Sequence, residues 1–226
     1  MIRNLRALGI AFVAVFAMSA VAASAAHATA AHFRCGTTGT LSCNITVEQD
    51  PNKPTQLFKT HAGNVSCQKF HAIGPFSGTG PEITLTELEY KECELAGLAA
   101  TVTVPKGCHY TLTSGETEAE PEKSTGNVTL AVTAGESCKI EIKTLKCTVT
   151  VNGPQTFKNA VTYENVKTTH EEITGHATVN SIEYTTAATC PGGAGTFKDG
   201  VYEGTFTAKA FETSGPQTEL TLVDTP

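Results

Sequence analysis

The sequence predicts an all-β protein, both from its composition and from the spacing of its apolar residues. Thr makes up about one residue in six, and Val and Ile are plentiful. Branching at Cβ favours the pleated surface of a sheet over a helix. Apolar residues recur at every second position in short stretches, which is typical of strands that bury one face. Beyond residue 28, no apolar stripe persists at helical spacing for three turns.

The N-terminus predicts a secretory signal peptide over residues 1–28. Arg3 and Arg6 form a short positive region, an uncharged apolar run follows, and small residues with A-x-A cleavage patterns come next. This order is that of an export signal. A transmembrane anchor is the alternative, but the uncharged run is shorter than the roughly 20 apolar residues that a span needs. We therefore expect a secreted protein, extracellular or associated with the cell envelope, without a membrane span in the mature chain.

Residues 29–226 are predicted to form one disulfide-braced all-β domain, because a chain of this length fits a single large β domain. With Arg3 and Arg6 removed, 14 basic residues remain against 22 acidic ones, a net charge of −8, and Arg34 is the only arginine. Nucleic-acid binding requires basic patches, which this charge balance argues against. The expected partner is an unknown extracellular or cell-surface molecule and not a nucleic acid.

The eight cysteines predict four structural disulfides. An even number in an exported chain is typical of a disulfide framework. A metal site is the alternative, but no C-x-x-C pair occurs and no cysteine stands at zinc-ligand spacing from paired histidines. Among the 105 possible connectivities, sequential pairing closes the shortest loops. It joins Cys35 to Cys43, Cys67 to Cys93, Cys108 to Cys138, and Cys147 to Cys190.

Individual strands follow from the alternation along the chain. The clearest alternating sets, in chain order, are Val102/Val104, Tyr110/Leu112, Val128/Leu130/Val132, Ile140/Ile142, Val149/Val151, Val161/Tyr163, Phe206/Ala208/Ala210 and Leu220/Leu222. Two further stretches change phase midway, which predicts β-bulges near Thr86–Glu87 and Asn180–Ser181, with a strand break as the alternative. The segment 114–126 holds four glutamates and no aliphatic residue larger than Ala, so it is predicted to be a long exposed loop.

Short strands with turns between them predict an antiparallel two-sheet sandwich. A split near the 114–126 loop into two small tandem β domains is one alternative. A β-barrel is the other, since both architectures use the same alternating strands.

The usual catalytic and metal-binding motifs are all incomplete, so no catalytic, cofactor-binding or metal-binding residue is predicted. His170 and His176 resemble a zincin pair, but the fourth position after His170 is Thr174 and that motif needs a helix. Glu87 and Glu89 share one strand face, most simply the solvent face, and not two walls of a cleft.

Ligand binding without catalysis leaves little trace in this sequence. The chain has no Trp to stack on sugars. Its five tyrosines fall in strand register, and we interpret them as core residues with their hydroxyls at the rim of the sheet. A lipocalin-like cavity inside a barrel is also compatible with the pattern, and alternation alone does not reveal it.

Several segments built from cysteines, turns and Thr/Val alternation carry a resemblance that covers most of the mature chain. They are Asn64–Cys67, Cys93–Leu98, Gly107–Tyr110, Cys138–Ile142, Cys147–Val149 and Gly195–Tyr202. In these segments the chain resembles a group of uncharacterised secreted proteins of high-GC soil actinobacteria, which has no established activity. The resemblance implies export and disulfides. Cys35 and Cys43 are additional to the group's pattern, which implies that they pair with each other.

Taken together, these patterns predict a secreted, non-enzymatic β-sandwich protein that serves as a binding or structural module for an unknown ligand. The alternative is an extracellular hydrolase with a site built from scattered His and Glu residues. A bond from His170 or His176 to a carboxylate inside a concave pocket would favour that hydrolase.

Overall fold

The computed structural model describes residues 30–50, 53, 55–117 and 123–224. The signal peptide predicted over 1–28 lies outside these residues. The described part is all-β, as predicted, and contains seventeen strands and no helix. Within that part, therefore, no helix is long and apolar enough to cross a membrane. The first nine strands are β1 (Ala31–Cys35), β2 (Ser42–Gln49), β3 (Gln56–Thr60), β4 (Gly63–Ser77), β5 (Thr79–Gly80), β6 (Glu82–Leu85), β7 (Glu87–Leu95), β8 (Leu98–Thr103) and β9 (Cys108–Thr117).

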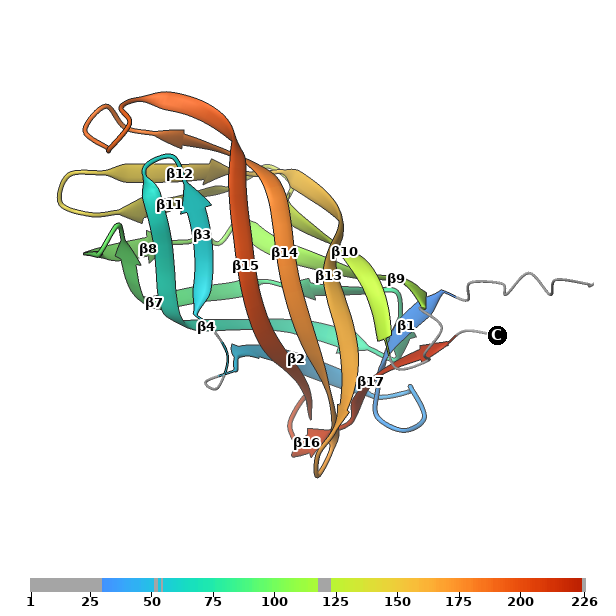
Figure 1. The fold of residues 1–226 in the computed structure, drawn as a ribbon. Coiled ribbons are helices and arrows are strands. Elements are labelled where there is room, and N and C mark those ends of the chain that lie inside the picture. Colours follow the sequence, from blue (N-terminus) through green and yellow to red (C-terminus); the bar gives the residue numbers. More distant parts are fainter. Residues whose placement is uncertain (1–29, 51–52, 54, 118–122, 225–226) are drawn as a thin grey trace, which may run out of the picture.

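The second half of the chain supplies the longest strands. These eight are β10 (Lys123–Val132), β11 (Lys139–Lys143), β12 (Thr148–Asn152), β13 (Gln155–Lys167), β14 (Glu171–Thr186), β15 (Gly195–Glu212), β16 (Gln217–Thr218) and β17 (Leu220–Asp224). In Figure 1 the long strands β13, β14 and β15 cross over β4 and β7, so that the two sets of strands face each other with different directions.

Eight of the strands close into an antiparallel barrel. Hydrogen bonds connect them in the order β15-β2-β4-β7-β8-β11-β12-β14, and β14 pairs back with β15. The sandwich prediction is not confirmed, and the barrel alternative fits. Alternation along a strand identifies its buried face but does not say whether the first and last strands of a sheet meet, and here they do.

Further strands extend this barrel. From the free part of one edge of β14, the order continues β13-β10-β9-β6, and a separate three-stranded sheet, β17-β1-β5, lies at one end. In that small sheet the first and last described strands pair, from Ala31 with Asp224 to Cys35 with Leu220.

Strands on both sides of the 114–126 segment belong to one fourteen-stranded sheet, so the described part does not divide into two tandem β domains there. Strands before that segment pair with strands after it, for example Val102 with Ile142 in β8 and β11, and Ile45 with Ala210 in β2 and β15. The predicted long loop is also shorter than expected. Its ends belong to β9 and β10, where Ser114 pairs with Gly126, because Ser and Thr side chains are compatible with strands.

One of the two predicted bulges is confirmed. The pairing of β14 with β15 shifts between Val179 and Ile182, and Ser181 has a φ of 62°. The prediction near Thr86–Glu87 is wrong, and its alternative, a strand break, is what occurs. There β6 ends at Leu85 and pairs with β9, whereas β7 begins at Glu87 and pairs with β4 and β8.

The predicted sequential pairing of all eight cysteines is confirmed. Cys67–Cys93 joins directly paired residues of β4 and β7, and Cys35–Cys43 ties the small sheet to the barrel. Cys108–Cys138 and Cys147–Cys190 close the other two loops. Each bridge adds roughly 2–4 kcal/mol by restricting the unfolded chain. Such a framework fits an oxidising compartment.

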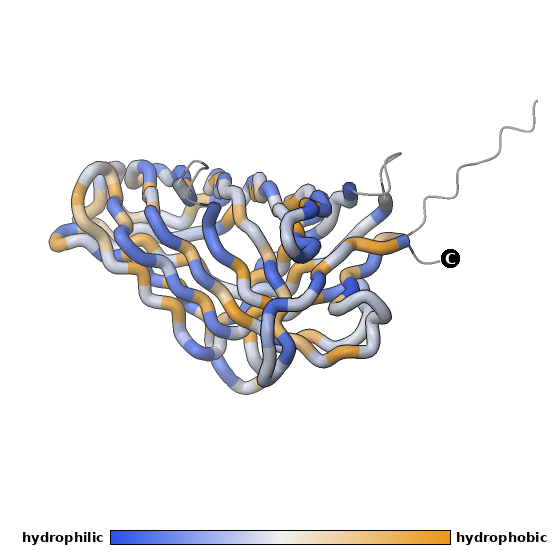
Figure 2. Tube along the Cα trace, turned by 90° about the horizontal axis from the view of Figure 1, so that it is seen from below, coloured by the Kyte–Doolittle hydropathy of each residue, from blue (hydrophilic) through white to orange (hydrophobic). Residues whose placement is uncertain are grey.

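Apolar side chains meet inside the barrel and between it and its extension. Hydrophobic and hydrophilic residues alternate along the strands in Figure 2. The largest cluster of buried residues packs Phe33 edge-on against Tyr163, and a second cluster surrounds Tyr184 and the Cys147–Cys190 bridge. The side chains that line the space between these clusters form the candidate site.

Candidate functional site

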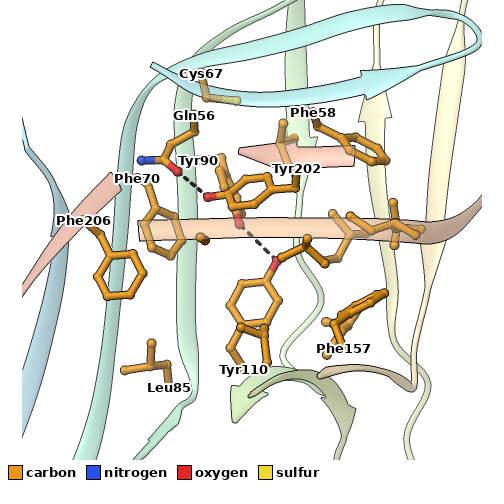
Figure 3. A pocket seen from close by; sticks show the side chains of 18 of the residues that line it. Gln56, Phe58, Cys67, Phe70, Leu85, Tyr90, Tyr110, Phe157, Tyr202 and Phe206 are labelled. Atoms are coloured by element: carbon orange, nitrogen blue, oxygen red, sulfur yellow. Dashed lines mark hydrogen bonds between the residues drawn. The ribbon is translucent and has the colours of Figure 1, made fainter. Parts of the chain in front are cut away.

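A cavity of about 140 Å³ lies in the interior, lined by side chains from both sets of crossing strands. Its wall includes Phe70 from β4, Leu85 from β6, Phe157 from β13 and Phe206 from β15 (Figure 3). The lining is almost entirely aliphatic and aromatic, and none of the described residues in it carries a charge. Concave, mostly apolar sites with a few placed polar groups are the usual form of small-molecule sites.

Four polar side chains of the cavity lining form two hydrogen-bonded pairs, drawn as dashed lines in Figure 3, and the hydroxyls of Tyr90 and Tyr202 interact between the pairs. The hydroxyls of Tyr90 on β7 and Tyr110 on β9 lie 3.0 Å apart and share a hydrogen bond. The Tyr202 hydroxyl on β15 donates to Oε1 of Gln56 at the start of β3. Gln56 Nε2 in turn donates to the carbonyl oxygen of Thr205 at 3.0 Å. We call these four residues, Tyr90, Tyr110, Tyr202 and Gln56, the tyrosine–glutamine chain.

Burial keeps the hydroxyls of this chain neutral. Loss of solvation raises the pKa of Tyr90 well above its usual range, and the neighbouring hydroxyls of Tyr110 and Tyr202 raise it further. Desolvation also raises the pKa of Tyr110, against a smaller opposing effect of its hydrogen bond with Tyr90. Desolvation raises the pKa of Tyr202 as well, with Tyr110 adding to the shift. The three hydroxyls therefore remain donors and acceptors without charge.

The chemistry available in the cavity is thus hydrogen bonding within an apolar enclosure. A phenolic hydroxyl donates one hydrogen bond and accepts others, and a carboxamide does both. A bound hydroxyl or carbonyl group could join the tyrosine–glutamine chain while the rest of the molecule contacts Phe and aliphatic side chains. A charged group would be buried without a partner of opposite charge, which is strongly unfavourable.

Next to the cavity, on the outside, lies a polar groove between β13 and β14, with a volume of about 530 Å³. Residues 155–160 of β13 line one side, and Thr178, Asn180, Ser181 and Glu183 of β14 line the other. Gln155 and Phe157 line both this groove and the interior cavity. The two spaces are therefore separated by very few side chains.

The two histidines singled out from the sequence lie away from the cavity. His176 is exposed, and its Nδ1 lies 3.1 Å from the Thr205 hydroxyl. His170 lies in the turn before β14, where its carbonyl oxygen accepts from Thr168. Neither lines the cavity, and among the ion pairs of the described residues the one that involves a histidine joins His71 to Glu48, at the surface.

The carboxylates behave as the sequence suggested. Glu89 is exposed and pairs with Lys91 at 2.8 Å, and Glu87 is exposed on the same strand. Within the described residues, no group of three or more His, Cys, Asp and Glu side chains is placed to hold a metal ion.

The tyrosine prediction needs a correction. The hydroxyls of Tyr90, Tyr110, Tyr163 and Tyr202 do not lie at the rim of the sheet. Those of Tyr90, Tyr110 and Tyr202 point into the interior, and that of Tyr163 is buried with no hydrogen-bond partner among the described residues. The Tyr184 hydroxyl donates to Asp199 at 3.0 Å and accepts from the backbone of His61 at 2.6 Å.

A signal for the inward tyrosines is present in the sequence. Tyr110 has the same parity as Leu112, and Tyr202 the same parity as Phe206, and both stand among mid-strand apolar residues. Side chains of one parity share one face of a strand. Gln56, by contrast, follows a turn-rich segment, and no pattern marks it as buried.

Comparison with protein-family models, with curated proteins and with solved structures finds no match to this chain. The resemblance noted in the sequence therefore stays a prediction, and the geometry of the interior carries the functional argument.

Proposed function

We propose that this protein is an exported, non-enzymatic binding protein that holds a small uncharged molecule in the cavity between the strands of its barrel and those of the extension. The observation that carries the proposal is an apolar cavity lined by two hydrogen-bonded pairs of neutral groups, with no charged side chain among the described residues that line it. The four disulfides support an extracellular role because they brace a small domain under oxidising conditions.

The size of the cavity limits the ligand. A volume of about 140 Å³ is close to that of an engineered cavity of about 150 Å³ that binds benzene. Drug-sized ligands occupy about 300 Å³ or more. The ligand class that fits is therefore a single six-membered ring or a short branched chain.

The polar groups define the rest of the ligand. Neutral hydroxyls of Tyr90, Tyr110 and Tyr202 favour a partner with one hydroxyl or carbonyl group, such as a phenol or a cyclic alcohol. Carboxylates and amines of the same size are disfavoured because the lining offers no counter-charge.

The proposal is tested by calorimetric titration with phenol, benzene, cyclohexanol and, as a charged molecule of similar size, benzoate. We expect saturable binding of phenol and cyclohexanol, weaker binding of benzene and none of benzoate. Tyr90→Phe should reduce the preference for phenol over benzene, because it removes the central hydroxyl of the tyrosine–glutamine chain.

A pair of variants controls for binding elsewhere. Val128→Phe adds a ring inside the cavity and should abolish binding, whereas Val201→Phe adds the same ring next to Tyr202 at a position outside the lining and should not. Circular dichroism establishes that both variants fold. Lack of saturable binding by any probe, or equal binding by Val128→Phe and the unmodified protein, would contradict the proposal.

A further inference from the structure

The wall of the barrel divides along one edge of β14. Near its N-terminal end this edge pairs with β13, up to Val161 with Ala177. Near its C-terminal end the same edge pairs with β12, beginning at Val151 with Tyr184. Between Ala177 and Tyr184, neither β12 nor β13 continues the ladder along this edge. We call this interruption the β13–β14 seam.

The outer groove occupies this seam. Its lining residues are those of β13 and β14 between the two ends of the interruption, together with Lys198 of β15. Lys198 forms an ion pair of 2.9 Å with Glu183 at the rim. Because Gln155 and Phe157 also line the interior cavity, the groove lies directly outside it.

Bulges on both sides hold the two strands apart. Asn159 on β13 and Ser181 on β14 have φ angles of 51° and 62°, a left-handed conformation that is unfavourable for residues with a side chain. On β13 the bulge is supported by Asn127, whose Oδ1 accepts from the backbone N–H of Asn159 at 3.0 Å. Strain of this kind persists where the surrounding structure imposes it.

Among the described residues, the side chain of Gln155 bridges the seam. Gln155 Nε2 donates to the carbonyl oxygen of Glu183 at 2.8 Å, and Gln155 Oε1 accepts from the backbone N–H of Glu183 at 2.8 Å. The carboxamide thus takes the place of the backbone that would complete the ladder. It also donates to the carbonyl oxygen of Asn152 at 2.7 Å.

A side-chain bridge differs from a ladder in how it opens. Rotation about the side-chain bonds of Gln155 breaks both contacts with Glu183 without moving either strand, and solvent in the groove can satisfy the groups that are released. Opening a true ladder would require displacement of a strand held on both edges. Side-chain rotations are also far faster than strand displacements.

We propose that the β13–β14 seam is the entrance to the interior cavity and that Gln155 is the latch that closes it. Phe157, the other residue common to both spaces, forms the inner wall of the entrance. This inference rests on the proposed function, since an entrance has a role only if a ligand reaches the cavity.

The latch is tested by the rates of phenol exchange, measured by NMR line shapes. Gln155→Leu keeps the approximate volume of the side chain and removes its hydrogen bonds. We expect the association and dissociation rates to rise together by roughly tenfold, with the dissociation constant changed by less than about twofold, because a gate alters both directions alike.

Gln217→Leu is the matched control, since Gln217 donates one hydrogen bond to Glu172 away from the seam. It should leave both rates unchanged. Unchanged rates in Gln155→Leu, or a change in affinity without a change in the association rate, would overturn the latch while leaving the proposed function intact.

A second measurement needs no ligand. Hydrogen exchange of the Glu183 amide reports opening of the latch, because its acceptor is the Gln155 side chain. In the unmodified protein this amide should exchange at least about tenfold faster than that of Thr174, which lies in the regular part of β14. If it exchanges only on global unfolding, the latch does not open and the inference fails, whatever the binding experiments show.

Discussion

On both β14 and β15, one edge of the strand changes partner along its length, and a glutamine stands at each change. On β15 the partner changes from β3 to β2 between Glu203 and Phe206, and Gln56 bonds to the intervening backbone at Thr205. On β14 the partner changes between Ala177 and Tyr184, and Gln155 bonds to the backbone of Glu183. We call these the Gln56 junction and the Gln155 junction.

The two junctions differ in burial. Gln56 is 2% exposed, and its amide oxygen receives the Tyr202 hydroxyl. Gln155 is only partly buried and lies beside a polar groove. When a buried amide loses its contacts, its partners have no other group to bond to, whereas water replaces the contacts of an exposed one. The same side chain thus fixes one junction permanently and closes the other reversibly.

The largest expected effect is unfolding at alkaline pH, caused by ionisation of the three buried tyrosines near the Gln56 junction. Burial raises the pKa of Tyr90, Tyr110 and Tyr202 above the unfolded value of about 10. A raised pKa in the folded chain favours the neutral hydroxyl, so this contribution to stability is fully present below about pH 10. It is lost as the pH rises above 10 towards the folded values.

The near-ultraviolet absorbance of phenolate tests this prediction. All five tyrosines have raised pKa values, so phenolate should appear in one cooperative step that coincides with loss of the folded circular-dichroism signal. In guanidinium the same chain should titrate gradually near pH 10. Gradual titration of the folded protein near that pH would show that the tyrosines are hydrated and that the Gln56 junction is not sealed.

The next effect in size is the cost of removing each glutamine amide. Gln56→Leu should lower the free energy of unfolding by about 3 kcal/mol, because the Tyr202 hydroxyl and the Thr205 carbonyl oxygen each lose a hydrogen bond to a buried amide that water does not readily replace. Gln155→Leu should lower it by less than about 1 kcal/mol, because water in the groove replaces its bonds. Guanidinium denaturation of both variants measures the difference. Equal losses would mean that the two junctions are equally buried and that Gln155 does not act as a latch.

Much of the fold that creates these junctions could be predicted from the sequence, but the junctions themselves could not. Alternation predicted the strands, and the phase change at Asn180–Ser181 predicted a bulge that now lines the seam. The sequential disulfides also followed from short loop closure. Alternation does not say which strand lies beside which, so it could not predict that β14 and β15 change partner along their length.

The candidate site was missed for a related reason. In a two-sheet sandwich, inward tyrosines would pack in a filled core, whereas here a cavity remains between strands of the barrel and of its extension, and Tyr90 and Tyr110 project into it from the two sides. Whether an inward polar group meets protein or empty space depends on strand order, which only the structure supplies. Gln56 and Gln155 are polar residues at the starts of strands, and nothing in their local sequence separates the buried one from the exposed one.

The smallest expected effect concerns the strain at the Gln155 junction. Ser181 has a φ of 62°, and glycine adopts this conformation without penalty. Ser181→Gly should therefore relieve backbone strain at this position. Relief of strain of about 1 kcal/mol is partly offset by the greater freedom of glycine in the unfolded chain, so we expect a net stabilisation of about 0.5 kcal/mol. Guanidinium denaturation measures it, and exchange of the Glu183 amide should be no slower than in the unmodified protein. Such a result would mean that the extra residue in the backbone of the bulge keeps the strands apart and that the serine side chain contributes nothing. A loss of stability greater than about 1 kcal/mol would instead show that the Ser181 side chain stabilises the seam. The difference between the Gln155 junction and the Gln56 junction would then come from side chains and not from the backbone of the bulge.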